Sequence, residues 1–537
     1  MKMKYRIKQT PQAQQLVNSL DFRGLLNQVI CPAYARIQQE KQEAENFGAV
    51  FFHPMEVSEL RIAIRRFQEA AGISPLIVSD LECGPGNMIQ GAARFPYMMG
   101  LSQTNSPELA YEAGKIAAQE AGELGYNWTF SPVVDLAADP DSPVVSMRSP
   151  GQDPEHVIKM AGAYMQGLQD HGMIATIKHF PGDGHSSLDH HLTTSVNPLT
   201  QREWWKGPGR VFQALIDDGA MAVMPGHIAL PAFDVPDENG LYPPAALSKR
   251  LLVDLLRTKM GFEGLIVSDA IEMGGAVGYM NYYDACAAAL ENGCDLLLFP
   301  RVNERFYTEM ECRMESGKLS LQTLRDRAGR ILSLKEQLGL FGQKEASQAV
   351  ENTQNPAISK EHNVRVAERI ARESITLVRD RKGLVPFPIK PETRVLHAVI
   401  MNNHDRYAEL YERVKRELAK HTAHVEQWVD PGPDRLFEAA GGGSFDLILC
   451  SIGSRLSYGL NVVRLHDEVA RNMMGGWTKL DTPIIFVSHF HPFVHKEYEA
   501  SIDTLINTYG DIEVTVKYLV DALTGTYAIR RELLAHN

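Results

Sequence analysis

Short apolar runs alternate with longer amphipathic stretches over residues 20–341. The runs are rich in Val, Ile and Leu and are bounded by Gly, Pro or polar residues, which is typical of buried parallel strands. We predict eight such strands, at residues 27–33, 47–53, 75–80, 127–135, 173–179, 220–227, 264–269 and 294–300.

Helix signals lie between these runs. Ser106, Asp153 and Ser248 each stand where an N-cap is expected, and Gly172 stops the second of the three helices. Eight strands that alternate with helices favour an α/β fold of the (β/α)8 barrel type, with a doubly wound open sheet as the weaker alternative.

The pattern changes after a helix predicted at 319–341. The next residues are polar and poor in large apolar side chains, as in a linker. Further strands are predicted at 395–401, 446–452, 484–488 and 503–508, and they indicate a smaller α/β sandwich. We therefore predict a barrel domain over 1–344, a linker over 345–364 and an α/β sandwich domain over 365–537.

Composition and charge narrow the classes of partner. Hydrophobic residues make up 44% of the chain and charged residues 22%, as in ordinary globular proteins. The net charge is −12 and no basic stripe is present, so we expect no nucleic-acid partner. The N-terminus lacks the apolar segment of a signal peptide, and no run is long enough to span a bilayer, so we expect no membrane partner.

The number and spacing of the cysteines indicate the cellular compartment. There are six, none forms a CxxC pair, and none has the spacing of a structural zinc site. Few and scattered cysteines fit a reducing environment, so we predict a cytoplasmic location.

Polar side chains recur where the predicted barrel strands end. Because the carboxyl ends of barrel strands open onto one mouth, such side chains are expected to converge in a pocket for a small molecule. The residues at these ends are Asp80, Asp135, Lys178, His179, His227 and Asp269.

The loop after the fifth strand, IKHFPGDGHSSLDHHLTTS (177–195), allows three interpretations. A zinc site is disfavoured, because His185 and His190 are five residues apart in an irregular loop and His190 and His191 are adjacent. A solvated polar loop is the plainest alternative. General acid/base chemistry is the third, since Asp189 lies two residues before His191 and a carboxylate there fixes the tautomer of the imidazole.

Three segments of the chain resemble the family 3 glycoside hydrolases, most closely their β-N-acetylglucosaminidase branch. IKHFPGDGHSSLDHH resembles that branch's Lys-His-Phe-Pro-Gly-x-Gly signature with Asp-x-His after it, and LSKRLLVDLLRTKMGFEGLIVSDAIEMGGA resembles the nucleophile segment. SMRSPGQDP resembles the family's arginine-bearing loop. The likeness covers most of residues 20–341, and RESITLVRDRKGLVPFP resembles the opening of the family's second domain.

The resemblance implies a retaining mechanism through a covalent glycosyl-enzyme. It implies Asp269 as the nucleophile, His191 as the acid/base and Asp189 as the group that orients it. The residues expected to bind the sugar are Asp80, Arg148, Lys178, His179 and His227. We predict no metal site and no cofactor, and a loop around Pro181, Gly182 and Gly184 that closes over bound sugar.

One loop departs from the family pattern. The family's sugar-binding loop commonly has an arginine at each of the positions that Pro85 and Met88 occupy here. Bacterial members that recycle cell-wall fragments usually keep these arginines, so the resemblance does not imply that role.

The predicted activity is hydrolysis of terminal β-linked N-acetylglucosamine by an exo-acting β-N-acetylhexosaminidase. The alternatives are a β-glucosidase or β-xylosidase, a β-N-acetylglucosaminide phosphorylase, and a binding protein for carbohydrate without catalysis. The expected partner is a small carbohydrate, and the chain is expected to be a monomer or a homodimer.

Overall fold

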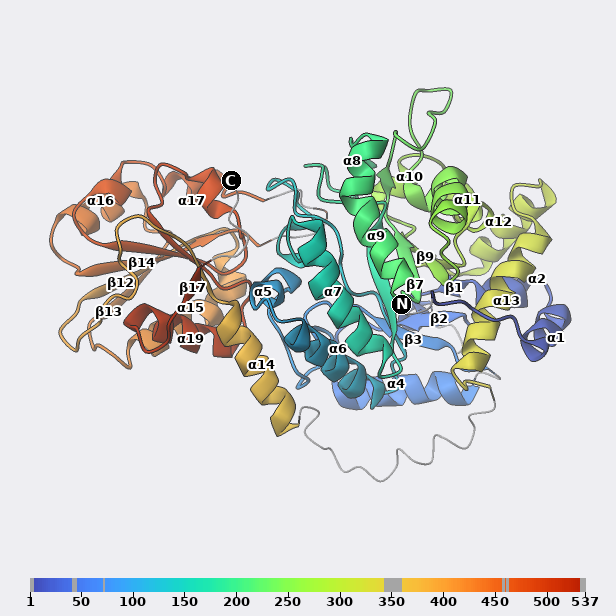
Figure 1. Cartoon of the computed structure of the whole chain (residues 1–537), viewed down its shortest axis with the longest axis horizontal. Coiled ribbons are helices and arrows are strands. Elements are labelled where there is room, and N and C mark those ends of the chain that lie inside the picture. The colour runs from blue at the N-terminus through green and yellow to red at the C-terminus, as the bar shows by residue number, and fades with distance from the viewer. Residues whose placement is uncertain are drawn as a thin grey trace.

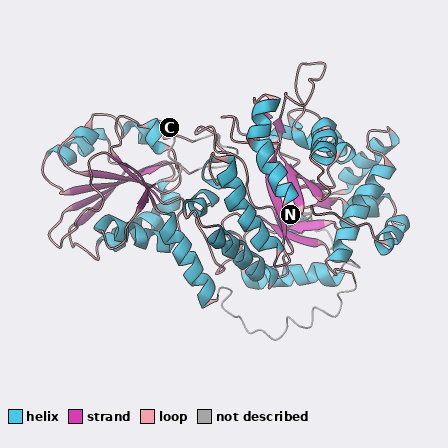
Figure 2. Ribbon diagram, in the orientation of Figure 1, coloured by secondary structure: helices cyan, strands magenta, loops and turns pink. Residues whose placement is uncertain are grey.

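A computed structural model describes residues 4–40, 46–70, 73–341, 360–455, 459 and 463–531. Its two main sheets, one of eight strands and one of seven, lie at opposite ends of the long axis of the molecule (Figure 1). Helices surround the strands in both parts (Figure 2). The fold is therefore a (β/α)8 barrel followed by a smaller α/β sandwich, as predicted.

The eight barrel strands are parallel and follow one another around the barrel in chain order. A bridge between Ala33 and Phe51 joins the first strand to the second and brings the sheet close to full closure. The strands are β1 (Ile30–Cys31), β2 (Ala49–Phe51), β3 (Leu76–Ser79), β4 (Trp128–Thr129), β5 (Ile174–Phe180), β7 (Ala222–Pro225), β9 (Leu265–Ala270) and β10 (Leu296–Leu298). Each lies within or at the edge of a predicted run.

Helices cover the outside of the barrel. They are α1 (Pro11–Ser19), α2 (Phe22–Gln28), α3 (Tyr34–Gln39), α4 (Val57–Ala70), α5 (Met98–Gln103), α6 (Pro107–Gly122), α7 (Pro154–Gln169), α8 (Gln201–Lys206), α9 (Pro208–Asp217), α10 (Gly274–Val277), α11 (Tyr282–Asn292), α12 (Glu304–Glu315) and α13 (Leu321–Gln337). Short turns η1 (Pro85–Asn87), η2 (Ser146–Arg148) and η3 (Ala245–Leu247) and a small pair of strands, β6 (Ser195–Val196) and β8 (Ile228–Ala229), lie in the loops.

The predicted N-caps form. The Ser106 hydroxyl accepts a hydrogen bond from the N–H of Leu109, and the Asp153 carboxylate accepts one from His156, so each satisfies a donor that the first helical turn leaves open. The segment after Ser248 is a π-helix, η4 (Arg250–Lys259), with i to i+5 hydrogen bonding.

The second sheet is mixed. Five parallel strands lie in the order β13, β12, β14, β15, β16, and β11 then pairs antiparallel to β16, with β17 at its edge. Their bounds are β11 (Thr376–Asp380), β12 (Val395–Met401), β13 (Val425–Val429), β14 (Leu447–Gly453), β15 (Ile484–Ser488), β16 (Thr504–Asn507) and β17 (Arg530–Arg531). Four of these strands were predicted; β11, β13 and β17 were not.

Helices cover both faces of this sheet. Alternate residues of β12 belong to different hydrophobic clusters: Val395 and Val399 pack in one, and Leu396 and Ile400 in the other. The helices and turns of this part are α14 (Glu361–Ser374), η6 (His404–Tyr407), α15 (Ala408–Leu418), α16 (Pro433–Gly441), α17 (Asp467–Arg471), η7 (Trp477–Lys479), α18 (Val494–Glu497) and α19 (Glu513–Thr524).

Residues 345–359 of the predicted linker lie outside the described residues. The predicted linker end at 364 falls inside α14, whose polar first turn concealed the helix from composition alone. The exact domain limits stay a prediction.

The two parts share a hydrophobic cluster. Met99, Val144 and Met147 of the barrel side pack in the same buried cluster as Phe493 and Tyr509 of the sandwich. The contact is therefore built like a protein interior and not like a wet surface.

Candidate active site

A buried carboxylate, Glu82, joins two of the predicted sugar-binding residues. It accepts hydrogen bonds from Arg148 Nη2 at 2.8 Å and Nε at 2.9 Å, and Lys178 Nζ lies 2.7 Å from its Oε1. Lys178 Nζ also donates to Asp80 Oδ1 at 2.8 Å. Asp80 is the most exposed member, with 36% of its side chain accessible, and so it is the group of the cluster that a ligand reaches most easily.

The charges of this cluster support one another. Burial raises the pKa of Glu82, but Arg148 and Lys178 outweigh that effect and hold the pKa well below its usual range. Burial lowers the pKa of Lys178, but Asp80 and Glu82 outweigh it and raise the pKa overall. The cluster is ionised at neutral pH and offers a rigid set of donors and acceptors.

Asp135 fixes the ring of His179. Its Oδ2 lies 2.7 Å from His179 Nδ1, while its Oδ1 accepts the backbone N–H groups of His179 at 3.0 Å and of Asp183 at 2.8 Å. Because an ionised carboxylate only accepts, Nδ1 carries the hydrogen. In the neutral ring, Nε2 then presents its lone pair, and it is the atom that can bind a ligand.

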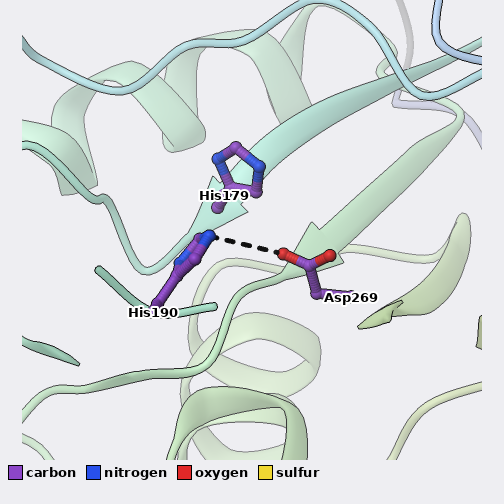
Figure 3. Close-up of side chains that lie close together, drawn as sticks. All are labelled: His179, His190 and Asp269. Carbon is purple, nitrogen blue, oxygen red and sulfur yellow. Dashed lines mark ion pairs between the residues drawn. The ribbon is translucent and has the colours of Figure 1, made fainter. Parts of the chain in front are cut away.

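Asp269 lies near the end of β9, with 12% of its side chain accessible. Its Oδ1 accepts the N–H of Ala270 at 2.7 Å. Its Oδ2 makes no hydrogen bond and faces His190 Nε2 at 3.9 Å (Figure 3). Burial raises the pKa of Asp269, but the positive charge available to the surrounding imidazoles, His179 first, lowers it overall. Asp269 therefore presents an ionised carboxylate with one uncommitted oxygen.

Behind His190 lies a second buried carboxyl group, Asp183. Its Oδ2 is 3.3 Å from His190 Nδ1. Burial and the nearby Asp135 charge raise the pKa of Asp183 to about 8, and burial holds the pKa of His190 well below its usual value. A buried pair of this kind directly beside Asp269 was not predicted.

The loop that carries these residues is docked on α10. Gly274 donates its N–H to the carbonyl of His191 at 2.7 Å, and Gly275 donates to that of His190 at 3.2 Å. A Cβ at Gly274 would lie 2.2 Å from the Leu192 oxygen, so the close approach requires glycine there. These bonds hold the loop over the end of β9.

The predicted Asp189–His191 pair forms. Asp189 Oδ1 accepts from His191 Nδ1 at 2.7 Å and from the His191 backbone N–H at 2.9 Å. Asp189 Oδ2 accepts the N–H of Gly459, from the sandwich part of the chain, at 2.9 Å. Burial raises the pKa of Asp189, but the bonds from His191 outweigh it and lower the pKa. His191 keeps 24% of its side chain accessible, with Nε2 as its second ring nitrogen.

His227 follows β7 and is fully buried. Its Nε2 donates to the carbonyl of Ala270 at 2.9 Å, so the ring supports the strand end that carries Asp269. Burial lowers the pKa of His227, and its Nδ1 makes no hydrogen bond. Its predicted contact with sugar stays a prediction and has only Nδ1 to offer.

The structure thus brings the predicted residues together at the carboxyl ends of β3, β5, β7 and β9 and in the loops that follow β4 and β5. It adds Glu82, Asp183, His190 and Gly459, to which sequence reasoning gave no role. Glu82 stands two residues after Asp80, in the loop that was compared with the family's sugar-binding loop, but no role was assigned to it there. Nothing in the spacing pointed to Gly459.

The mouth of this (β/α)8 barrel contains two carboxylates, a carboxylate-bound imidazole and a lysine–arginine cluster. These are groups of the kind that glycoside hydrolases use. Residues 18–334 match the model described as the glycosyl hydrolase family 3 N-terminal domain. The chain belongs to glycoside hydrolase family 3 and is an enzyme of that class.

Relatives with assigned names agree with this family. A β-N-acetylglucosaminidase/β-glucosidase of Cellulomonas fimi is 31% identical over 89% of this chain and 86% of its own length. A β-hexosaminidase of Tolumonas auensis is 35% identical over 45% of this chain and 71% of its own length.

Solved structures agree as well. A β-glucoside phosphorylase, BglX, bound to 2FGlc superposes with a TM-score of 0.86 at 28% identity, over 97% of this chain and 96% of that one. A family 3 β-N-acetylglucosaminidase from Paenibacillus sp. shares the fold with a TM-score of 0.79 at 24% identity, over 95% of this chain and 98% of that one.

Two general properties complete the description. Among the described residues, no helix combines the length and apolar character needed to cross a membrane. All six cysteines are free thiols, and Cys312 alone is exposed.

Proposed function

We propose that the protein is a retaining, exo-acting β-N-acetylhexosaminidase that releases terminal β-linked N-acetylglucosamine. The observation that carries this proposal is the Asp189–His191 pair, in which a buried carboxylate holds Nδ1 of a partly exposed imidazole at 2.7 Å. Such a pair supplies a proton donor and acceptor near neutral pH, which a glycosidase needs on one side of the scissile bond.

Asp269 supplies the nucleophile. Its Oδ2 is the attacking atom, because Oδ1 is already engaged by the N–H of Ala270. Attack of Oδ2 on the anomeric carbon breaks the bond to the glycosidic oxygen, which takes a proton from Nε2 of protonated His191. The products of this step are the free alcohol, a neutral imidazole and a glycosyl ester of Asp269.

Hydrolysis of the ester reverses the roles. Neutral His191 accepts a proton at Nε2 from a water molecule, whose oxygen attacks the anomeric carbon as the ester bond to Asp269 breaks. Two displacements at one carbon retain the β configuration. Throughout, Asp189 keeps Nδ1 protonated, and the N–H of Gly459 stabilises the carboxylate charge.

The sugar hydroxyl groups are assigned to the ionised cluster at β3 and β5. Asp80 accepts from hydroxyl groups, and Lys178, Arg148 and His179 donate or accept around them. Glu82 sets the positions of Lys178 and Arg148. Rigid partners of this kind raise specificity because an unmatched sugar leaves them unpaired.

Phosphorolysis is a second candidate activity. The likeness to a β-glucoside phosphorylase over nearly the whole chain favours it. The chemistry agrees, because a carboxylate that has given up its proton repels phosphate, whereas neutral His191 does not. A phosphate oxygen then attacks the anomeric carbon as the ester bond to Asp269 breaks, which releases sugar 1-phosphate and the Asp269 carboxylate.

The identity of the sugar has alternatives within the family. The name of the Cellulomonas fimi relative joins two activities, β-N-acetylglucosaminidase and β-glucosidase, so a β-glucosidase or β-xylosidase activity is the alternative within the family. A protein that binds carbohydrate without catalysis is the alternative outside enzymes. We further propose a cytoplasmic location, which the free thiols support, and a monomer or homodimer as the active form.

One set of measurements tests the proposal. Nitrophenyl β-N-acetylglucosaminide is expected to be cleaved faster than the matched β-glucoside or β-xyloside, and a 5-fluoro glycosyl inhibitor is expected to label Asp269 in mass spectra. Sugar 1-phosphate in phosphate buffer identifies phosphorolysis. A label on Asp80, or sugar binding without turnover, would contradict the assignment.

A further inference from the structure

Three side chains, one of them the proposed nucleophile, enclose one point in the barrel mouth. His179, His190 and Asp269 each offer one ligand atom, and these atoms lie within 4.8 Å of one another (Figure 3). All three side chains are buried, and they come from β5, from the loop after it and from β9. The convergence of three segments explains why the spacing of the histidines in the loop gave no sign of such a group.

The polar atoms at this point lack ordinary partners. His190 Nδ1 and Nε2, Asp183 Oδ2 and Asp269 Oδ2 are all buried and make no hydrogen bond. Unsatisfied buried polar atoms are rare in proteins, and each costs about 1–3 kcal/mol. Two of the four, His190 Nδ1 and Asp183 Oδ2, face each other at 3.3 Å. The other two, His190 Nε2 and Asp269 Oδ2, are 3.9 Å apart and are open to a further ligand.

Each imidazole is backed by a carboxyl group. Asp135 holds His179 Nδ1 at 2.7 Å, and Asp183 lies 3.3 Å from His190 Nδ1. The second nitrogen of His190 faces Asp269 Oδ2 at 3.9 Å. A carboxylate behind a histidine, with the lone pair of the other ring nitrogen turned to a shared point, is the arrangement that orients histidine ligands in metal sites.

We propose that His179, His190 and Asp269 bind a divalent transition-metal ion, zinc above all. Two imidazole nitrogens and one carboxylate oxygen match the ligands that zinc prefers, and magnesium and calcium prefer oxygen alone. Tetrahedral zinc holds its ligand atoms about 2.1 Å from the ion and so roughly 3.4 Å from one another. His190 Nε2 and Asp269 Oδ2 are 3.9 Å apart, and all three ligand atoms lie within 4.8 Å of one another, so the side chains must move closer together to hold the ion.

The ion and the sugar exclude one another at this point. A bound cation engages Asp269 Oδ2, the oxygen that attacks the anomeric carbon, so zinc is a reversible inhibitor that competes with sugar. This exclusion rests on the proposed function, whereas the binding of the metal does not. By linkage, sugar weakens zinc binding by the same factor as zinc weakens sugar binding.

Zinc binding to the purified, chelator-treated full chain, without substrate, tests the proposal. Zinc sulfate is titrated by calorimetry, with the bound metal counted after dialysis. We expect one zinc ion per chain in the unaltered protein and in the surface control His404→Ala, and none in His190→Ser. Equal stoichiometry in His190→Ser and the control would overturn the site.

A second variant, Asp183→Asn, tests the site even if His190→Ser does not fold. Asp183→Asn keeps all three ligands and removes the carboxylate behind His190, so zinc affinity is expected to fall by about 10–100-fold with the stoichiometry unchanged. Unchanged affinity in Asp183→Asn would contradict the arrangement of ligands. Cobalt in place of zinc gives a second readout, since intense visible absorption reports tetrahedral nitrogen and oxygen ligands.

Activity separates this inference from the proposed function. If zinc binds at His190 and the metal-free protein cleaves no sugar, the metal site stands and the glycosidase assignment fails. If sugar is cleaved and added zinc leaves the rate unchanged at a concentration that fills the site, the exclusion is wrong.

Discussion

His190 and His191 are neighbours in the chain but lie in different environments. His190 is fully buried beside Asp269 and Asp183, whereas His191 keeps 24% of its side chain accessible and is bound by Asp189. Accessibility suits a group that must reach both a leaving group and a water molecule. At the scale of single residues, this difference in accessibility supports the proposed proton-transfer role of His191 over one for His190.

His191→Ala should slow substrates with poor leaving groups far more than those with activated nitrophenyl leaving groups, because only the former need a proton on departure. General acid catalysis contributes about 10²–10⁴-fold, which sets the expected loss for poor leaving groups. Rates for a series of aglycones of graded basicity measure the difference.

The neighbouring histidine His185 provides the control. His185→Ala should slow both classes of substrate alike or leave them unchanged. An equal loss for both classes in His191→Ala would show that this residue is not the acid.

Glu82→Gln should lower kcat/KM, because Lys178 and Arg148 lose the carboxylate that sets their positions. The expected loss of transition-state stabilisation is about 1–3 kcal/mol. Steady-state kinetics with the nitrophenyl substrate measure the loss, and Glu112→Gln, at a surface ion pair with Lys115, is the matched control. A lower unfolding temperature with unchanged kcat/KM would instead mark Glu82 as purely structural.

Residue-level prediction worked where chemistry is local and failed where it is not. Asp189 and His191 are two residues apart, so their spacing allowed, and the family resemblance implied, the bond that forms. Glu82 contacts Arg148 and Lys178 across long stretches of chain, and Gly459 is 270 residues from Asp189 in the sequence. No local pattern contains such contacts.

At the scale of elements, burial decided which strands could be predicted. All eight barrel strands are apolar runs in the sequence because they are covered on both sides. β13 and β17 lie at the two edges of the second sheet, where polar residues are tolerated, and so their sequences, VEQWV and RR, carried no strand signal.

α13 contains a buried lysine. Lys335 is fully inaccessible, and its Nζ donates to Gln28 Oε1 at 3.0 Å and to the carbonyl of Phe47 at 2.9 Å. Burial lowers the pKa of Lys335 to about 7. Lys335 thus connects α13 to α2 and to the residues just before β2, and its burial favours the uncharged amine in the folded protein.

This lysine makes stability depend on pH in a definite direction. In the unfolded chain it stays protonated to near its usual pKa, so between about pH 7 and pH 10 the unfolded state binds the extra proton. The free energy of unfolding should therefore rise with pH in this window, by about 1.4 kcal/mol per pH unit from this group. Below pH 7 the contribution is constant, because both states are protonated.

Lys335→Met should remove that slope. Urea unfolding at pH 7, 8 and 9 measures it, with Lys318→Met, an exposed lysine, as the control. Equal pH dependence in Lys335→Met and the unaltered chain would show that Lys335 is charged in the fold.

At the scale of the whole molecule, the contact between barrel and sandwich is close at one glycine. A Cβ at Gly100 in α5 would lie 2.8 Å from Cβ of Tyr509 and 2.8 Å from Cβ of Pro96. The backbone N–H of Tyr97 also donates to the carbonyl of Tyr509 at 3.1 Å. The two parts therefore meet with no space for a methyl group.

Gly100→Ala should lower the unfolding temperature and separate the unfolding of the two parts in calorimetry, since Tyr509 must move away. The control is Gly122→Ala, at the end of α6, where no atom lies within 4 Å of the added methyl group. Both changes gain about 0.5–1 kcal/mol of helix propensity, so only the collision distinguishes them. Equal stability of the two variants would contradict the close contact.

The whole-molecule arrangement could be predicted only in outline. Two apolar patterns separated by a polar stretch indicated two parts, but the shared cluster of Met147 with Phe493 arises from residues that look like ordinary core in each part. Periodicity shows that a side chain is buried, not which domain buries it.

The hydrogen bond from Gly459 to Asp189 limits how the barrel can be reused by protein engineering. Asp189 binds His191 through Oδ1 and accepts the backbone N–H of Gly459, from the sandwich part of the chain, at Oδ2. In a barrel produced without the sandwich, or in the same loop grafted onto a single-domain scaffold, Asp189 Oδ2 beside the proposed acid/base His191 would lose its hydrogen-bond donor. The graft becomes functional only when a neighbouring amide or hydroxyl of the new host is aimed at that oxygen.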